Sequence, residues 1–421
     1  METYATVLAY AIPGFIVLII IESLVARWKG MHINQPMDLI SSLSSGITNT
    51  LKTLMGLSVV IISYDWMVSK IGIWDLQATP FVYVLAFIGL DFKGYWSHRL
   101  EHQFNILWNR HVIHHSSEEY NLACALRQEI SAIFGVFFFL FIPLAILGVP
   151  TKVIAITAPL HLFAQFWYHT RVIDKMGFLE YIVVTPSHHR VHHAINDIYL
   201  DKNFSQIFIF WDKWFGTFQE ELEDEPPVYG TKRPAKTWNP VFINFMHFWA
   251  LLQDAWYTRS WWDKFRLFFM PTGWRPQDVM DRYPIAYYKK ASEQIKYTSH
   301  PSAFLTYWSW LQLVINFGLL FHFMSIIGDI SLTQIMLYGS FLLVSVIAYT
   351  SLMDQHISAL IFESIKMAFG VLLLYQYGSW FGINDLFAWG TWAVLAYLGV
   401  SLLMSFYFMR KSPRFSLVDE K

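Results

Sequence analysis

The chain has 421 residues, of which 55% are hydrophobic, 18% aromatic and only 14% charged. Soluble domains average about 45–50% apolar and about 25% charged residues, so this composition indicates a membrane protein. The net charge of −1 offers no basic surface for nucleic acid. A single cysteine, Cys124, excludes an intramolecular disulfide and a cysteine-rich zinc site.

Apolar runs recur along the chain, and a membrane-spanning helix needs about 20 such residues. They predict an all-α fold, a polytopic membrane helical bundle. The candidate spans are 5–24, 46–65, 79–97, 131–149, 152–169, 303–327, 333–353, 359–377 and 386–408. Only Pro150 and Thr151 separate the fourth run from the fifth, which predicts a tight helical hairpin that enters and leaves on one side.

Four segments follow from this pattern. We predict N-terminal transmembrane helices at 1–84, a histidine-rich domain at 85–230, an interfacial amphipathic segment at 231–300 and C-terminal transmembrane helices at 301–421. Within the third segment, residues 240–275 mix bulky apolar and charged residues at helical spacing. That pattern fits either a helix in the plane of the membrane interface or an amphipathic core helix.

Basic residues indicate the orientation, because they favour the cytoplasmic side of a membrane. They follow the first, third and last runs, as Arg27, Lys29, Arg99, Arg110, Arg410, Lys411 and Arg414. All lie on one side if the first helix runs inward and the hairpin returns to the inside. We therefore predict an integral multi-pass protein of the endoplasmic reticulum or a bacterial inner membrane, with a cytoplasmic cap that carries the histidines.

Three groups of histidines follow the third apolar run and the hairpin. Residues at i, i+3 and i+4 share one face of a helix, so each group points its imidazoles in one direction. The eight rings exceed the four ligands of one zinc ion and suit two metals. A redox-active pair beside lipid favours iron among the metals that imidazole binds. The predicted ligands are His98 and His102, then His111, His114 and His115, then His189, His192 and His193.

Further candidates surround these three groups. His169 ends the hairpin on the same side and is predicted as a ninth ligand, whereas His161 and His188 are expected beside the ligands. A metal-bound histidine usually donates its second N–H to a carboxylate or a carbonyl. Candidate acceptors are Asp91, Glu101, Glu118 and Glu119, and the three glutamates also fit solvated loop charges.

At its histidines the chain resembles the fatty acid hydroxylase and sterol desaturase superfamily of membrane di-iron proteins, whose pattern is HxxxH, HxxHH and HxxHH. Between about residues 85 and 230 it resembles more narrowly the alkylglycerol monooxygenases. The segments that carry this likeness include DFKGYWSHR, HHSSEEYNL, QFWYHT, TPSHHRVHH, DKN and WDKWFGTF. The helices expected beyond residue 300 resemble the same group.

The resemblance implies a di-iron monooxygenase that uses O₂ and an electron donor to hydroxylate the ether-linked carbon of an alkylglycerol lipid. The hemiacetal so formed falls apart into a fatty aldehyde and a glycerol. Tetrahydrobiopterin is the donor that the animal enzymes imply. Gln103 stands directly after the first box, where the animal type has a glutamate, which leaves the donor open.

Other functions remain open on the sequence. A sterol or fatty-acyl hydroxylase or desaturase would carry the same boxes. A membrane metal transporter or store would place ionisable residues deep inside its spanning helices, whereas here the boxes gather at helix ends. A zinc hydrolase would need fewer ligands. Trp96, Trp108, Phe166 and Trp167 could line a lipid channel or pack within the membrane.

Overall fold

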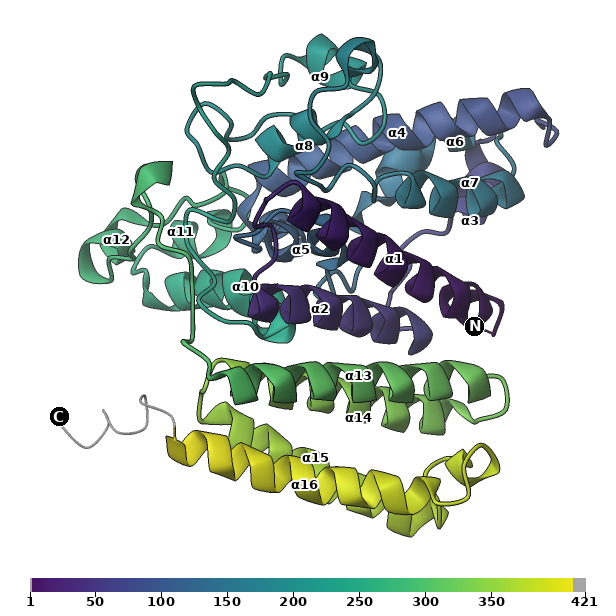
Figure 1. The fold of residues 1–421 in the computed structure, drawn as a ribbon. Helices are drawn as coiled ribbons and strands as arrows, with labels where there is room; N and C mark the ends of the chain where they lie inside the picture. The colour runs from purple at the N-terminus through teal and green to yellow at the C-terminus, as the bar shows by residue number, and fades with distance from the viewer. Residues whose placement is uncertain (1, 412–421) are drawn as a thin grey trace.

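The computed structural model describes residues 2–411, so the predicted basic residue Arg414 lies outside the described range. Within that range the chain is helical, and the β-structure consists of isolated bridges (Figure 1). The α-helices are α1 Glu2–Trp28, α2 Pro36–Leu54, α3 Tyr64–Ile71, α4 Pro80–Gln103, α5 Asn105–His115, α6 Ile142–Ile146, α7 Thr151–Phe163, α8 Pro186–His192, α9 Phe210–Phe215, α10 Pro240–Tyr257, α11 Trp261–Arg266, α12 Gln277–Arg282, α13 Ala303–Ile326, α14 Leu332–Met353, α15 Ser358–Tyr377 and α16 Gly390–Lys411. Short 3₁₀ turns lie at Leu122–Leu126, Val136–Phe141, Gly177–Tyr181, Ala291–Glu293 and Ile383–Asp385.

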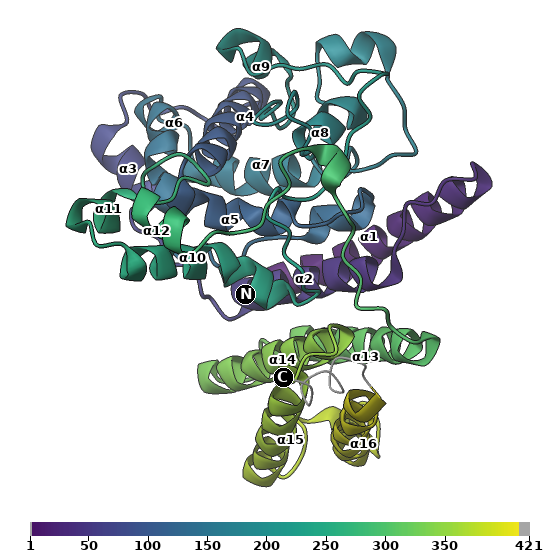
Figure 2. The ribbon, with the colours of Figure 1, turned by 90° about the vertical axis from the view of Figure 1, so that its left-hand side faces the viewer.

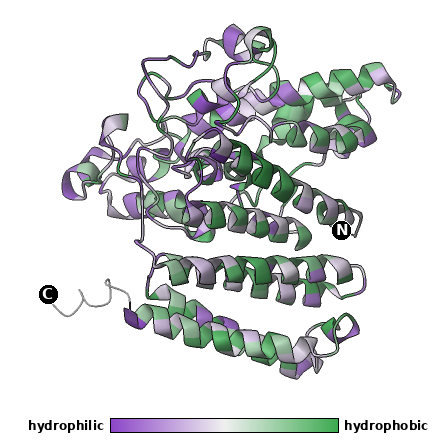
Figure 3. Ribbon diagram, viewed as in Figure 1, coloured by the Kyte–Doolittle hydropathy of each residue, from purple (hydrophilic) through white to green (hydrophobic). Residues whose placement is uncertain are grey.

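Five of these helices are long and apolar enough to cross a membrane: α1 from Ala5 onwards, α13, α14, α15 and α16. They are the mostly green helices at the bottom and centre of Figure 3, whereas polar residues gather around α8, α11 and α12. The prediction of an all-α, polytopic membrane bundle is confirmed, and the protein is an integral multi-pass membrane protein.

Four other predicted spans differ from the structure. The run 46–65 is broken, because α2 ends at Leu54 and Gly56 adopts a positive φ of 67° before α3 begins at Tyr64. The run 79–97 lies in α4, which carries the buried Asp91 and so departs from a purely apolar span. The predicted hairpin consists of the short helices α6 and α7, with Pro150 at the N-cap of α7.

Helices α13–α16 form a layer beneath α1 and α2 (Figure 1), and the rotated view separates this layer from the rest of the chain (Figure 2). Helix α13 packs against α1 and α2, and α14 packs against α2, α13 and α15. Inside this layer Lys366 and Glu363 form a fully buried ion pair at 2.8 Å. Because α13 and α14 pack against α1 and α2, one apolar core contains residues from both ends of the sequence.

The junction of α4 and α5 positions the first two histidine groups. Thr79 caps α4 and Pro80 starts it, a favourable pairing at a helix N-terminus. Phe104 then serves as the C-cap of α4 and the N-cap of α5 in an extended conformation. The chain turns at this single residue, so the last turn of α4 lies beside α5.

Helix α10 covers α5 from the side opposite α4. It buries Ile243 and Leu251 and packs against α5 and α2. Its other face exposes 61% of Trp249 and 81% of Trp256. The helix thus has both a core face and an aromatic outer face. The interfacial position of 231–300 stays a prediction, as does the four-segment division of the chain.

Candidate metal centre

The last turn of α4 and the whole of α5 present the first two histidine groups to each other. His98 and His102 are one turn apart on the buried face of α4. Their Nε2 atoms lie 2.9 Å from Nε2 of His111 and 3.2 Å from Nε2 of His115, respectively, on α5. Helical spacing of four residues on both helices therefore produces two matched pairs of rings.

The third group lies on α8, which starts after Thr185 and Pro186. His188 turns back toward Thr185, and its Nδ1 lies 3.3 Å from both the amide nitrogen and the hydroxyl of that residue. The His188 ring thus caps its own helix, and its role beside the ligands stays a prediction. The other histidines of the group, His189, His192 and His193, face α4 and α5.

The structure sorts nine imidazoles into two clusters, in each of which the candidate ligand atoms all lie within 4.8 Å of one another. Cluster one consists of His98, His102, His111, His115 and His192. Cluster two consists of His114, His169, His189 and His193. The nine clustered histidines are the nine residues predicted as ligands. The histidine groups on α5 and α8 each contribute to both clusters.

His169 completes cluster two from outside the three boxes. Its Nε2 lies 2.9 Å from Nε2 of His189 and 3.3 Å from Nε2 of His114. The Nε2 atom of His193 lies 3.1 Å from that of His189. Two nitrogens bound to one ion at about 2.0–2.1 Å each are separated by roughly 3–3.4 Å. The observed spacing is therefore that of ligands around a common ion.

Hydrogen bonds to the outer ring nitrogens fix where the lone pairs point. Nδ1 of His98 lies 2.8 Å from the carbonyl oxygen of Phe204, and Nδ1 of His192 lies 2.9 Å from that of Lys202. A carbonyl oxygen only accepts, so Nδ1 of each neutral ring donates and its Nε2 carries a lone pair. Nε2 of His192 is buried and has no hydrogen-bond partner among the described residues.

The same logic holds in cluster two. Nδ1 of His114 faces the carbonyl oxygen of Arg127 at 3.3 Å, and Nδ1 of His169 faces that of Gln165 at 3.0 Å. Their Nε2 atoms, 3.3 Å apart, are then two acceptors with no proton between them. Burial lowers the pKa of His169 to about 4 and that of His114 well below its usual value, which favours the neutral rings. A shared cation resolves this opposition of lone pairs, so the residues fit a metal.

Only two of the clustered histidines, His102 and His111, have a carboxylate near Nδ1 among the described residues. Glu101 places Oε2 at 3.6 Å from Nδ1 of His111 and is paired with Arg110 at 3.1 Å. Burial raises the pKa of Glu101 to about 7, against the effect of Arg110. Asp201, which the sequence analysis missed, places Oδ1 at 3.3 Å from Nδ1 of His102. In the sequence, Asp201 stands in the DKN segment, which is one of the segments that carry the family resemblance. In the structure its backbone has a positive φ of 55°.

Asp91 and Glu118 have other partners than the ones predicted. Asp91 is fully buried, and among the described residues it forms no hydrogen bond with a cluster histidine; it accepts from His161 Nε2 at 2.9 Å. His161 in turn contacts Gln165, whose carbonyl oxygen orients His169. Glu118 accepts from the backbone N–H of Tyr297 and so connects the segment before α13 to the loop after α5. Glu119 pairs with Arg171 and Lys296.

Two cavities reach the clusters from different sides. The membrane-side cavity, of about 540 Å³, is lined by apolar residues of α1, α2, α7 and α13, among them Ile12 and Phe15, and by Phe166 from the segment after α7. It touches histidines of both clusters: His98, His111, His114, His169 and His189. Its volume lies in the range of about 300–1,000 Å³ that small-molecule sites occupy.

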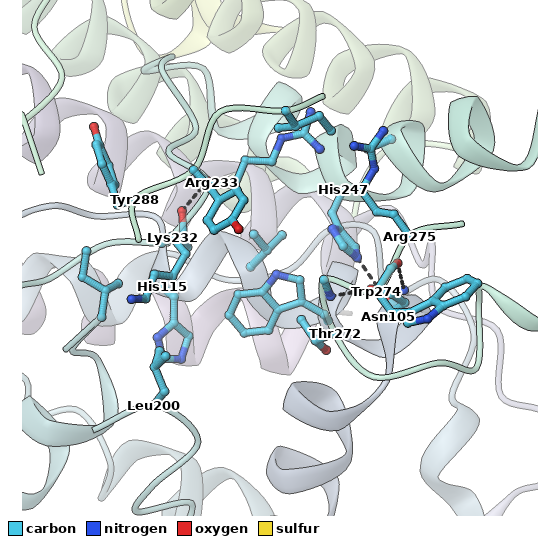
Figure 4. A pocket seen from close by; sticks show the side chains of 18 of the residues that line it. Asn105, His115, Leu200, Lys232, Arg233, His247, Thr272, Trp274, Arg275 and Tyr288 are labelled. Carbon is cyan, nitrogen blue, oxygen red and sulfur yellow. Dashed lines mark hydrogen bonds between the residues drawn. The ribbon is translucent and has the colours of Figure 1, made fainter. Parts of the chain in front are cut away.

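The cap cavity, of about 710 Å³, touches cluster one alone, at His102, His115 and His192. Its walls combine aromatic and charged side chains, and Figure 4 shows His115, Leu200, Lys232, Arg233 and Tyr288 around one part of it. Of the aromatic residues singled out from the sequence, Phe166 lines the membrane-side cavity and Trp108 lines the cap cavity; Trp96 and Trp167 line neither.

Comparison with known proteins agrees with this site. The family model described as fatty acid hydroxylase matches residues 83–217, which include all nine clustered histidines. No solved structure matches the chain significantly. The chain is 34% identical to the alkylglycerol monooxygenase of Homo sapiens over 87% of its own length and 82% of that protein.

Two further relatives are similar to this chain over different lengths. The alkylglycerol monooxygenase of Danio rerio is 34% identical over the same shares of the two chains. The ornithine lipid hydroxylase OlsE of Rhizobium tropici is 30% identical over 34% of this chain and 44% of its own. These matches identify an oxidoreductase that acts on lipids. The chain belongs to the alkylglycerol monooxygenase family.

Proposed function

We propose that this protein is a di-iron monooxygenase that hydroxylates the ether-linked carbon of an alkylglycerol-type lipid. The observation that carries the proposal is the placement of two clusters of buried imidazoles at a cavity whose wall is formed in part by the candidate membrane helices α1 and α13. One iron ion would bind to each cluster. When bound, the two ions supply activation of O₂ and the redox chemistry, which no side chain of the protein can provide.

The protein's own residues do the positioning. The carbonyl groups of Phe204, Lys202, Arg127 and Gln165 hold four imidazoles with Nε2 directed inward. Such outer partners fix the tautomer and orientation of ligating histidines. Apolar side chains such as Ile12 and Phe15 form a wall that suits an alkyl chain and excludes water from the clusters.

The reaction balances with one external two-electron donor. One oxygen atom of O₂ enters the C–H bond beside the ether oxygen, and the other leaves as water with two electrons and two protons. The hemiacetal then breaks its C–O bond to release a fatty aldehyde and a glycerol. The donor reaches cluster one through the cap cavity in this proposal, and tetrahydrobiopterin is the first donor to test because Gln103 leaves its identity open.

We further propose that the cap faces the cytoplasm, in the endoplasmic reticulum or in a bacterial inner membrane. Basic residues at the ends of two candidate membrane helices support this orientation: Arg27 in the last turn of α1 and Arg410 in the last turn of α16. The substrate then enters from the lipid phase and the electron donor from the aqueous phase.

The test is release of fatty aldehyde from an alkylglycerol by the purified protein, with iron measured on the same sample and with or without tetrahydrobiopterin. We expect His192→Ala in cluster one and His114→Ala in cluster two to abolish turnover and to lower bound iron. His32→Ala, which alters an exposed histidine, is the matched control and should keep both. Full turnover by either cluster variant would exclude the proposal.

A parallel assay with sterols and with free fatty acids addresses the rival reactions of the superfamily. Products from those substrates, without aldehyde from alkylglycerol, would replace the ether-lipid assignment by a sterol or fatty-acyl oxidation. Metal transport is disfavoured because the clustered histidines lie outside the five candidate membrane helices. A zinc hydrolase is disfavoured because its single ion takes about four ligands, fewer than the clusters offer.

A further inference from the structure

One face of α10 is a continuous stripe of exposed apolar side chains. Its members recur at intervals of three and four residues, which is the spacing of a single helical face. They are Phe242, Phe245, Trp249, Leu252 and Trp256, all of which are exposed. From Phe242 to Trp256 the helix rises by about 21 Å, so the stripe runs along most of its length.

The next helix, α11, extends this surface with further aromatic side chains. Trp261, Trp262 and Phe265 of α11 and Phe269 after it are 84%, 64%, 62% and 57% exposed, respectively. The ring of Phe265 lies 6.4 Å from that of Trp262 and 5.5 Å from that of Phe269, centroid to centroid. We call the stripe of α10 together with these four residues the aromatic outer face. Exposed apolar patches of this kind mark interaction surfaces.

The aromatic outer face begins beside a membrane helix. The ring of Phe242, at the start of the stripe, lies 6.2 Å from that of Phe362 in the second turn of α15, a candidate membrane helix. In Figures 1 and 2, α10 lies on the side of the cap that faces the layer α13–α16, and it packs against α2 and α14. The stripe is therefore continuous with the lipid-facing surface of the protein.

The composition of the surface is that of a membrane interface. Tryptophan is enriched where membrane helices meet water, and helices that lie along the interface present Trp, Phe and Leu to the bilayer. Residues 240–290 contain seven Lys and Arg and four Asp and no Glu, a net charge of +3 in a chain whose net charge is −1. Positive charge of this kind is attracted to anionic lipid on the cytoplasmic leaflet.

Basic and aromatic groups adjoin on this surface. Nζ of Lys264 lies 5.8 Å from the centre of the Trp261 ring, and it donates to the carbonyl oxygen of Ala255 at 2.6 Å. Arg259, between the two helices, is exposed. Protein interfaces are also rich in Trp and Arg, so composition alone does not choose between a protein and a bilayer. The contact with α15 decides for the bilayer, because lipid surrounds the exposed side of that helix.

We infer that the aromatic outer face lies in the headgroup region of the bilayer and prefers anionic lipid there. The opposite face of α10 contributes His247, Leu251 and Asp254 to the cap cavity, so this one helix separates that cavity from the membrane surface. The bilayer thus supports one wall of the cavity. This inference goes beyond the proposed function and does not depend on it, because binding to the bilayer needs neither iron nor turnover.

The test places a nitroxide spin label on the full-length protein in nanodiscs of phosphatidylcholine and phosphatidylserine, at Trp256→Cys and separately at Trp262→Cys. Collision rates are measured with O₂, which concentrates in lipid, and with a nickel chelate, which stays in water. The native Cys124 is only 1% exposed, and wild-type protein treated in the same way gives the background. Using two positions guards against one variant that fails to fold.

Two matched labels calibrate the measurement. Leu403→Cys on α16 is 70% exposed on a membrane helix and reports lipid, whereas Glu223→Cys in the exposed acidic loop reports water. We expect the ratio of O₂ to nickel collisions at both tryptophan positions to exceed that of Glu223→Cys at least several-fold. A ratio equal to that of Glu223→Cys would overturn the inference. Low collision rates with both reagents would also overturn it, because they would place the face against protein, such as a second copy of the chain.

A second measurement tests the preference for anionic lipid. A fluorophore on Trp256→Cys should be quenched more strongly by brominated phosphatidylserine than by brominated phosphatidylcholine at equal mole fraction. Arg259→Gln should reduce that difference, whereas Lys175→Gln, which removes a positive charge paired with Glu220 outside this segment, should leave it unchanged. Equal quenching by the two lipids in the protein with native Arg259 would refute the anionic preference.

Discussion

Replacement of Asp91 by asparagine tests how the buried carboxylate supports the metal centre. Oδ1 accepts from His161 Nε2 at 2.9 Å and from the amide of Ile207 at 2.8 Å. Oδ2 accepts from the amide of Phe208 at 3.0 Å and from Trp211 Nε1 at 2.8 Å. Asparagine keeps one oxygen and presents an NH₂ group to the other pair of donors, so two of the four hydrogen bonds are lost.

Each buried donor left without an acceptor costs about 1–3 kcal/mol, so Asp91→Asn should destabilise the fold by about 2–6 kcal/mol. The damage should reach the metal centre, because Phe204 and Lys202, whose carbonyl groups hold His98 and His192, lie in the same segment as Ile207. We therefore expect a lower melting temperature together with a reduced iron content.

The assay is thermal unfolding of the detergent-solubilised protein, followed by tryptophan fluorescence, with iron quantified before heating. Asp65→Asn is the matched control, since Asp65 makes an exposed hydrogen bond with Thr151 at 3.0 Å and surface changes usually cost less than about 0.5 kcal/mol. A wild-type melting temperature and full iron content in Asp91→Asn would refute this reading of the carboxylate.

Three further outcomes are expected. His169→Ala should retain roughly one of two iron ions and lose turnover, since it removes one of the four rings of cluster two; elemental analysis that finds two ions with full activity would exclude that role. Asp201→Ala should weaken iron binding by about 10–100-fold in a chelator competition, because it removes the carboxylate beside Nδ1 of His102. Lys366→Met should destabilise the protein by about 3–5 kcal/mol in thermal unfolding, because it leaves the buried carboxylate of Glu363 without its cation. Adding Glu363→Gln should restore most of the lost stability, and no recovery would argue against the ion pair.

The sequence alone was enough to identify the clustered histidines. Helical spacing places His98 with His102 and His111 with His115 on single faces, and this periodicity is a local property of the chain. The apolar runs at 303–327, 333–353, 359–377 and 386–408 correspond to α13–α16, since continuous apolar runs of that length have few alternatives to a membrane helix. The family followed from the motifs between the histidines.

Other features depended on contacts between distant parts of the chain. The break of the run 46–65 after Leu54 and the shortness of α6 and α7 had only weak local signals, because an apolar run looks the same in a spanning helix and in a packed one. Sequence spacing also could not show that His114 belongs to the cluster of His169 and not to that of His111 and His115. Nor could it show that Asp91 accepts a hydrogen bond from His161.

The division of nine imidazoles into a group of five and a group of four was decided by tertiary structure. Periodicity gives the face on which a side chain lies, but the partner of that face depends on how α4, α5 and α8 cross. That crossing is set by carbonyl and carboxylate contacts between residues about one hundred positions apart, such as His98 with Phe204 and His102 with Asp201. Such contacts form only when the whole chain has folded, which is why local spacing does not contain them.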